Sequence, residues 1–404
     1  MRVMDENIVL PAGFRAAGVA AGIKKRGGLD VALLVSDAPC VAAGVFTRNQ
    51  IKAAPVRWDQ AALAHNAHAM RAVVINSGCA NAVTGAQGEA DTADTALAVA
   101  EACDVAPTTV LVMSTGVIGQ PLPMPKLHTG ITAAVAALQG GAEGWNAAAH
   151  AIMTTDTRPK LATKHCMIGA TAIMISGICK GAGMIHPDMA TMLALVCTDA
   201  AVSVEALQAA LGWATDRSFN AVTIDGDSST NDTVLVLANG VAGNAAIQAD
   251  TPEFAVFQVA LTAVMSDLAQ QIARDGEGAT KFATIRVTGA LAFADAQRIA
   301  KTIATSPLVK TALFGADANW GRVLAAAGRA GVMLDPTRLA LWFDALQLVA
   351  EGAPTDYSEA DAHATLTKAE VVITLDLGLG TAEATVWTCD FSHDYVSINA
   401  DYRT

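Results

Sequence analysis

Residues 180–193 read Lys180-Gly-Ala-Gly-Met-Ile-His-Pro-Asp-Met-Ala-Thr-Met-Leu193. The two glycines and the Pro-Asp pair predict a constrained loop, and the apolar residues after Thr191 predict a buried strand. A threonine that follows a small residue at the end of such a loop is suited to attack the peptide carbonyl before it. Cleavage between Ala190 and Thr191 would free an α-amine, whose ordinary pKa is about 7.7–8.0, beside the threonine hydroxyl. One residue then supplies both nucleophile and base, so Thr191 is the candidate catalytic residue; the alternative is a buried threonine that merely starts a strand.

The composition excludes several classes of function. The chain of 404 residues has a formal net charge of −12 and no Lys/Arg block, which argues against a nucleic-acid partner or an anionic membrane surface. No apolar run approaches the about 18 residues of a membrane span, and the N-terminus does not resemble a secretory signal. The seven cysteines are scattered without CxxC spacing, and the eight histidines lack ligand spacing. We therefore predict reduced thiols, a cytoplasmic location and no metal site.

Strand-like and helix-like segments alternate along the chain, which predicts an α/β sandwich of layers. Short apolar runs predict strands at residues 72–75, 110–113, 171–175 and 284–288. Capping signals predict a helix after Ser203 and a long helix from Thr251-Pro252-Glu253 to Gly276, and an alanine-rich run predicts a helix over 92–103. Residues 371–377 and 383–388 flank a glycine-containing turn and predict a β-hairpin. No linker is visible, so the only boundary expected is the bond between Ala190 and Thr191.

The candidate oxyanion hole is in the Ser-Thr-Gly-Val-Ile-Gly segment at residues 114–119, at its Thr115-Gly116 pair. It follows a predicted strand, where Gly116 leaves a backbone N–H unobstructed and Thr115 adds a hydroxyl donor. Self-cleavage and acyl transfer both pass through a tetrahedral oxyanion, so one set of donors can serve both reactions. An ordinary turn after a strand is the alternative explanation.

Two charged residues are suited to an amino-acid substrate. Lys180 offers a compact ammonium for a carboxylate, and Glu277 stands between two glycines that leave its carboxylate open to a substrate ammonium. Either could instead be a solvated surface residue. The Thr-Thr-Asp-Thr sequence at 154–157 could grip an acetamide or carboxylate, or cap a helix.

Other conspicuous segments are less informative. Residues 225–232 resemble a calcium loop but lack its glycine at position six and glutamate at position twelve, so they predict a hydrogen-bonded turn near the site. Cys79 has no nearby histidine motif that would support a cysteine hydrolase. Residues 395–404 alternate apolar and polar side chains, which is typical of a docked terminal strand.

Taken in order, these motifs resemble those of the ornithine acetyltransferase (glutamate N-acetyltransferase) family of arginine biosynthesis over nearly the whole chain. The most specific are Met-Ala-Thr-Met-Leu at 189–193 and Ile-Asn-Ala-Asp-Tyr-Arg-Thr at 398–404. The departures are mild: Ala182 stands where serine is frequent, and His186 and Asp188 stand where many members have alanine and asparagine. These positions precede the scissile bond, so we expect them to affect processing more than turnover.

The resemblance implies a layered α-β-β-α sandwich similar to the N-terminal-nucleophile-like aminopeptidase fold. It also implies cleavage into an α chain, residues 1–190, and a β chain, residues 191–404, with two such pairs in a heterotetramer. Thr115 and Gly116 would stabilise the oxyanion. The substrate contacts that the resemblance implies are Thr154 (with Thr157 as the fallback), Lys180, Thr191, Glu277, Asn399 and Thr404.

The implied reaction moves an acetyl group from N2-acetyl-L-ornithine to Thr191 and then to L-glutamate, with no cofactor. Use of acetyl-CoA as a further donor stays open. Two alternatives remain: an amidase or aminopeptidase of the N-terminal-nucleophile class, which would deliver the acyl group to water, and an unprocessed paralogue that only binds amino acids.

Overall fold

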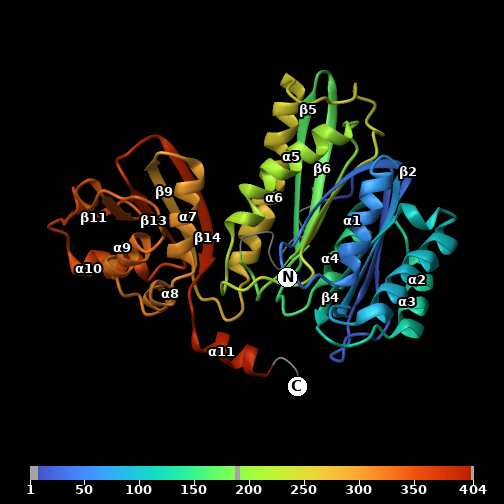
Figure 1. Ribbon diagram of the computed structural model, residues 1–404, viewed down its shortest axis with the longest axis horizontal. Coiled ribbons are helices and arrows are strands. Elements are labelled where there is room, and N and C mark those ends of the chain that lie inside the picture. The colour runs from blue at the N-terminus through green and yellow to red at the C-terminus, as the bar shows by residue number, and fades with distance from the viewer. Residues whose placement is uncertain (1–7, 187–191, 402–404) are drawn as a thin grey trace. The chain divides into compact units, whose positions relative to one another are not determined.

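The structure is a computed structural model that describes residues 8–186 and 192–401 (Figure 1). These residues form two compact units. The first contains residues 8–181, 192–218 and 227–268, and the second contains 182–186, 219–226 and 269–401. Each unit therefore includes residues from both sides of the predicted cleavage site.

The first unit is built on one mixed sheet with the order β4-β3-β2-β8-β7-β6-β5, and β1 pairs with β2. Its strands are β1 (Phe14–Val19), β2 (Val31–Phe46), β3 (Met70–Cys79), β4 (Val110–Val117), β5 (Lys160–Ile168), β6 (Thr171–Lys180), β7 (Leu193–Thr198) and β8 (Thr233–Ala238). The pairs β3–β4 and β7–β8 are parallel, and the other neighbours are antiparallel. The long strand β2 joins the two halves of the sheet, because its beginning pairs with β3 and its end with β8.

Helices cover the faces of this sheet. They are α1 (Ala54–Asn66), α2 (Gly85–Cys103), α3 (Met124–Ala136), α4 (Gly141–Ile152), α5 (Val204–Asp216) and α6 (Pro252–Arg274). Helix α6 belongs to the first unit as far as Leu268. A short 3-10 helix spans Pro107–Thr109. Apolar residues of α2 and α3 form one core with the half of the sheet that contains β2, β3 and β4. Trp145 of α4 lies in a second core that includes strands of both halves. The layered α/β fold predicted from the sequence is confirmed.

The second unit contains a smaller mixed sheet with the order β12-β11-β10-β13-β9-β14. Its strands are β9 (Phe282–Ala290), β10 (Ala340–Phe343), β11 (Leu346–Ala350), β12 (Ala353–Pro354), β13 (Glu370–Asp376) and β14 (Ala382–Cys389). Its helices are α7 (Phe293–Ala304), α8 (Pro307–Phe314), α9 (Trp320–Gly328), α10 (Glu359–Leu366) and α11 (His393–Ala400), with 3-10 helices at Phe219–Ala221 and Pro336–Arg338. Ile299 and Ile303 of α7 pack with Ile285 and Val287 of β9 in the core of this unit.

The predicted helix starts are confirmed by their caps. The Ser203 hydroxyl accepts a hydrogen bond from the Ala206 N–H at 3.2 Å, and the Thr251 hydroxyl accepts one from the Phe254 N–H at 3.1 Å. Each cap satisfies a backbone donor that has no partner within its helix. The long helix α6 ends at Arg274, two residues before the predicted stop at Gly276.

The predicted hairpin near the C-terminus is wrong. Strands β13 and β14 do not pair with each other, because β9 lies between them, parallel to β13 and antiparallel to β14. The N–H groups of Leu379 and Gly380 both donate to the Gly289 carbonyl, so the glycine-containing turn crosses the end of β9. A strand from about 90 residues earlier in the chain outcompetes the local pairing, and a local pattern carries no information about such a partner.

Two other predictions need correction. The strand predicted over residues 72–75 is longer than expected, because β3 continues through residues 76–78 to Cys79 beside β4. The alternating C-terminal segment forms the helix α11, not a strand. The helix begins after Ser392, whose hydroxyl accepts a hydrogen bond from the Asp394 N–H at 3.2 Å. This helix cap favours a helix although the side chains alternate as in a strand.

A buried acid in the first unit gives the fold a testable dependence on pH. Asp59 of α1 is fully buried and accepts from the Val112 N–H at 2.7 Å, while its other oxygen has no hydrogen-bond partner among the described residues. Burial raises the pKa of Asp59 well above its usual value, and the hydrogen bond opposes this only in part. The folded state therefore binds the Asp59 proton more tightly than the unfolded state, and this contribution to stability is lost as pH rises toward the raised pKa.

Asp59→Asn should consequently raise the free energy of unfolding by about 1–3 kcal/mol at pH 8, because it replaces a carboxyl group that is ionised in the unfolded state by an amide that is neutral in both states. The advantage should shrink as pH falls toward about 4, where the carboxyl of the parent is protonated. Urea unfolding of both proteins across this range measures the difference. An advantage that stays constant with pH would show that Asp59 does not titrate between the folded and unfolded states.

Candidate active site

The candidate oxyanion hole lies where two parallel strands end side by side in the first unit. In β3 and β4, Ser77 is paired with Thr115 and Gly78 with Gly116. Thr115 is 9% exposed, and Gly116 has a φ of +130°, a conformation that L side chains rarely adopt. A Cβ at Gly116 would lie 2.3 Å from the Gly78 carbonyl carbon, so only glycine fits at this point. The structure thus gives a physical reason for the glycine of the Thr-Gly pair.

Asn231 connects this strand end to the chain that follows the predicted cleavage site. Its buried side-chain amide donates to the Ser114 carbonyl at 2.8 Å and to the Ala80 carbonyl at 2.6 Å. Two residues later β8 begins, and the Thr233 N–H donates to the Met192 carbonyl at 3.1 Å. The end of β4 is therefore held close to the start of β7. Sequence reasoning included Asn231 only in a predicted turn, because its local pattern is that of an ordinary turn amide.

The segment that follows β3 is hydrogen-bonded to the end of β4 and to the first turns of α2. Ala80 N–H donates to the Val117 carbonyl at 3.0 Å, and the Asn81 side chain holds the first turns of α2 through Gly88 O at 2.9 Å and Thr92 Oγ1 at 2.9 Å. Asn81 has a φ of +47°, so this turn carries backbone strain beside the site.

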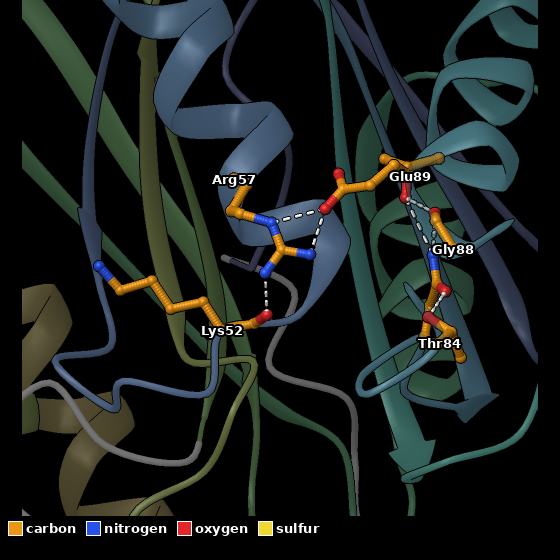
Figure 2. A network of polar contacts seen from close by, with 7 residues as sticks. Lys52, Arg57, Thr84, Gly88 and Glu89 are labelled. Atoms are coloured by element: carbon orange, nitrogen blue, oxygen red, sulfur yellow. Dashed lines mark hydrogen bonds and ion pairs between the residues drawn. The ribbon is translucent and has the colours of Figure 1, made fainter. Parts of the chain in front are cut away.

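A surface network lies next to this segment. Figure 2 shows the Arg57 guanidinium of α1 between the Glu89 carboxylate of α2 and the Lys52 carbonyl oxygen, with Thr84 and Gly88 at the first turn of α2. The Arg57 and Glu89 side chains are about half exposed, so the pair is worth at most about 1 kcal/mol. The pair joins α1 to the first turns of α2.

A buried carboxylate brings two predicted substrate contacts together. Asp156 accepts hydrogen bonds from Lys160 Nζ at 2.6 Å, the Gly181 N–H at 2.7 Å and the Thr154 N–H at 2.9 Å. Burial alone would raise the pKa of Asp156, but the ammoniums of Lys160 and Lys180 and the hydrogen bonds outweigh it and lower the pKa to about 2. Thr154 and Lys180, which is 5% exposed, are therefore both next to this carboxylate, whereas the fallback residue Thr157 is exposed.

Lys24 is a cation near the site that sequence reasoning missed. Its ammonium donates to the Leu29 carbonyl at 2.6 Å, and burial lowers its pKa, although the charges of Asp30 and Asp156 oppose this shift. The Lys24 backbone N–H lies beside Gly78, where a Cβ would approach it to 3.2 Å. Lys24 is followed by Lys25 and Arg26, and neighbouring cations of this kind are typical of solvated surface, so no local signal pointed to Lys24.

In the second unit, Glu277 and Asn399, two of the expected substrate contacts, are hydrogen-bonded to each other. Asn399 Nδ2 donates to Glu277 Oε2 at 2.8 Å, and Glu277 is 7% exposed. The Glu277 N–H donates to the Ala182 carbonyl at 2.7 Å, and a Cβ at Gly183 would lie 2.2 Å from the Glu277 carboxylate. The glycine-rich segment before the predicted cleavage site therefore passes directly over Glu277.

Asp225 anchors the same segment. Its carboxylate accepts from the Met184 and Ile185 N–H groups at 2.5 and 2.9 Å. This confirms the hydrogen-bonded role predicted for the start of the 225–232 segment. Within residues 8–186 and 192–401, no group of three His, Cys, Asp or Glu side chains is placed to hold a metal ion.

The remaining predicted site residues can be placed only in part. Ala190, Thr191 and Thr404 lie outside the described residues. Burial raises the pKa of the Cys79 thiol, which disfavours the thiolate that a cysteine hydrolase needs. Each of the seven cysteines is a free thiol. In the described part of the chain, no helix combines the length and the apolar character of a membrane span.

Known proteins match this chain in sequence over nearly its whole length. The sequence model of the ArgJ family matches residues 15–404. The arginine biosynthesis bifunctional protein ArgJ of Symbiobacterium thermophilum is 53% identical over 408 residues, which span 100% of both chains. The mitochondrial protein of the same name from Schizosaccharomyces japonicus is 46% identical over 98% of this chain and 93% of its own. A crystal structure of argJ from Bacillus halodurans has 43% identity and a TM-score of 0.49, covering 50% of this chain and 95% of that one. The full-length matches show that the chain belongs to the ArgJ family.

Proposed function

We propose that this chain is the acetyltransferase of arginine biosynthesis that moves an acetyl group from N2-acetyl-L-ornithine to L-glutamate. Membership of the ArgJ family supports the proposal, because its relatives at 53% and 46% identity are named arginine biosynthesis bifunctional proteins. The observation that carries it in the structure is the Asn231 link, which holds the Thr115-Gly116 strand end near Met192, the residue that follows Thr191 in the sequence. A nucleophile at Thr191 would then have oxyanion donors within reach.

The first reaction is self-cleavage. Thr191 Oγ attacks the Ala190 carbonyl, the peptide bond becomes an ester, and water opens that ester to give residues 1–190 and 191–404. Because each compact unit contains segments from both products, the two chains stay associated after the bond is cut. The new α-amine of Thr191 is then the base for its own hydroxyl.

The second reaction is acetyl exchange in two half-reactions. Thr191 Oγ attacks the acetyl carbonyl of N-acetylornithine; the C–N bond breaks, and ornithine leaves after its amine takes the proton held by the Thr191 α-amine. The α-amine of glutamate then attacks the acetyl ester, and the proton returns to the threonine oxygen. Both tetrahedral intermediates carry their negative charge on the oxygen that Thr115 and Gly116 face.

The proposed contacts of opposite charge bind different groups of the substrate. Lys180, with Thr154 nearby, receives the α-carboxylate that ornithine and glutamate share. Glu277, held by Asn399, receives the side-chain ammonium of ornithine, and Thr404 completes the set. The chemistry uses no cofactor, and acetyl-CoA would act as a second acetyl donor. The assembly is a heterotetramer of two α and two β chains in the cytoplasm.

Initial rates with both substrates test the proposal. An acetyl-Thr191 intermediate predicts parallel double-reciprocal lines and an acetylated β chain when glutamate is omitted. Release of acetate without glutamate at a comparable rate would identify an amidase or aminopeptidase instead. An intact chain that binds ornithine without turnover would identify a binding paralogue.

A further inference from the structure

The carboxylate of Asp156 joins two segments of the first unit that are far apart in sequence. One of its oxygens accepts from the Gly181 N–H at 2.7 Å and from Lys160 Nζ at 2.6 Å, and the other accepts from the Thr154 N–H at 2.9 Å. The Asp156 and Lys160 side chains have no exposed surface. The carboxylate thus fixes the distance between the segment after α4 and the end of β6.

Those two segments carry the proposed contacts for the shared substrate carboxylate. The backbone N–H of Thr154 itself donates to Asp156, and Lys180 directly precedes Gly181, which supplies the other backbone N–H. In the antiparallel pair β5–β6, Lys160 is opposite Cys179, so its ammonium reaches Asp156 from the strand beside Lys180. A change in the Asp156 carboxylate would therefore shift Thr154 and Lys180 relative to each other.

A buried ion pair is a poor way to gain stability alone, because its desolvation cost offsets most of the attraction and apolar replacements are often equally stable. We propose that Asp156 is a positioning residue for acetyl transfer, which holds Thr154 and Lys180 in the one arrangement that binds the substrate α-carboxylate, with Lys160 as its buried counter-ion. This role rests on the proposed function and extends it to a residue that does not itself touch the substrate.

Asp156→Asn tests the role with little change in shape. The asparagine oxygen can still accept from one backbone N–H, but its NH2 group faces another donor, so either Thr154 or Gly181 loses its partner. Once mass spectrometry shows complete self-cleavage, we expect KM for N-acetylornithine and glutamate to rise about 10–100-fold. We expect kcat to change by less than about threefold, because the nucleophile and the oxyanion donors are untouched.

Two further variants separate positioning from folding. Asp59→Asn alters another buried aspartate that accepts a backbone N–H in the same unit and should leave KM unchanged. In Asp156→Asn, the buried ammonium of Lys160 has lost the carboxylate beside it, which should lower the thermal midpoint of unfolding. The double variant Asp156→Asn/Lys160→Met also removes this ammonium, so its thermal midpoint should recover while KM stays high. If the single variant does not fold, KM of the double variant tests the positioning role of Asp156 in its place.

The outcomes are distinct. If the parent transfers no acetyl group, the proposed function fails whatever the variants do. If the parent is active and KM of Asp156→Asn matches that of Asp59→Asn, the positioning role is overturned. Recovery of KM together with the thermal midpoint in the double variant would overturn it too, because Asp156 would then serve stability alone.

Discussion

Thr191→Ala should leave the purified protein as one chain of 404 residues, whereas the parent should separate into chains of 190 and 214 residues. The variant lacks the only atom proposed to attack the Ala190 carbonyl, so neither the ester nor the new α-amine can form. Acetyl transfer should fall at least about 10⁴-fold, as it does when an enzyme loses its nucleophile. Intact mass and turnover, measured on the same preparation, check both effects.

Thr191→Ser is the matched control for this variant. Serine keeps the hydroxyl, so cleavage and transfer should both persist at reduced rates. The structure predicts that the uncleaved Thr191→Ala chain folds normally, since the described residues on either side, Lys180 and Leu193, are already paired between β6 and β7. Two fragments from Thr191→Ala would exclude self-cleavage by this residue, and a single uncut parent chain would favour the amino-acid-binding paralogue.

The candidate site residues that the sequence suggested are those whose signal is local. The Thr-Gly pair at 115–116, the lysine before the glycine-rich loop and the acid at Glu277 each stand in a short pattern with a chemical purpose. Family resemblance then supplied their common context. The structure adds that Asp156 touches the backbone of Thr154, and that Asn399 touches Glu277.

What the sequence could not predict depends on pairing over long distances. Asn231 acts on Ser114, which lies 117 residues earlier, and Lys24 reaches the site because its loop lies against Gly78. Neither residue differs in its local pattern from an ordinary turn amide or a surface lysine. The wrong hairpin at β13 and β14 has the same cause, since the residues of β9 that separate the two strands come from elsewhere in the chain.

Gly116→Ala should abolish most turnover for a geometric reason. At a φ of +130° the new Cβ would lie 2.3 Å from the Gly78 carbonyl carbon and 2.6 Å from the Cys79 nitrogen, both backbone atoms that cannot move aside cheaply. The ends of β3 and β4 must separate or the Gly116 peptide must rotate, and either change moves the N–H away from the oxyanion. We expect kcat to fall about 10²–10³-fold, the usual cost of losing one such donor.

Gly119→Ala provides the control, because Gly119 is also at a positive φ, +81°, but has no atom within 4 Å of the Cβ position. It should cost only about 1–2 kcal/mol of backbone strain and leave kcat within a few-fold of the parent. Since self-cleavage uses the same oxyanion donors, uncut precursor should accumulate in Gly116→Ala and not in Gly119→Ala. Turnover measured at a temperature where circular dichroism shows both variants folded separates this effect from unfolding. Equal turnover and equal processing in the two variants would remove Gly116 from the oxyanion hole and leave it a purely structural glycine between β3 and β4.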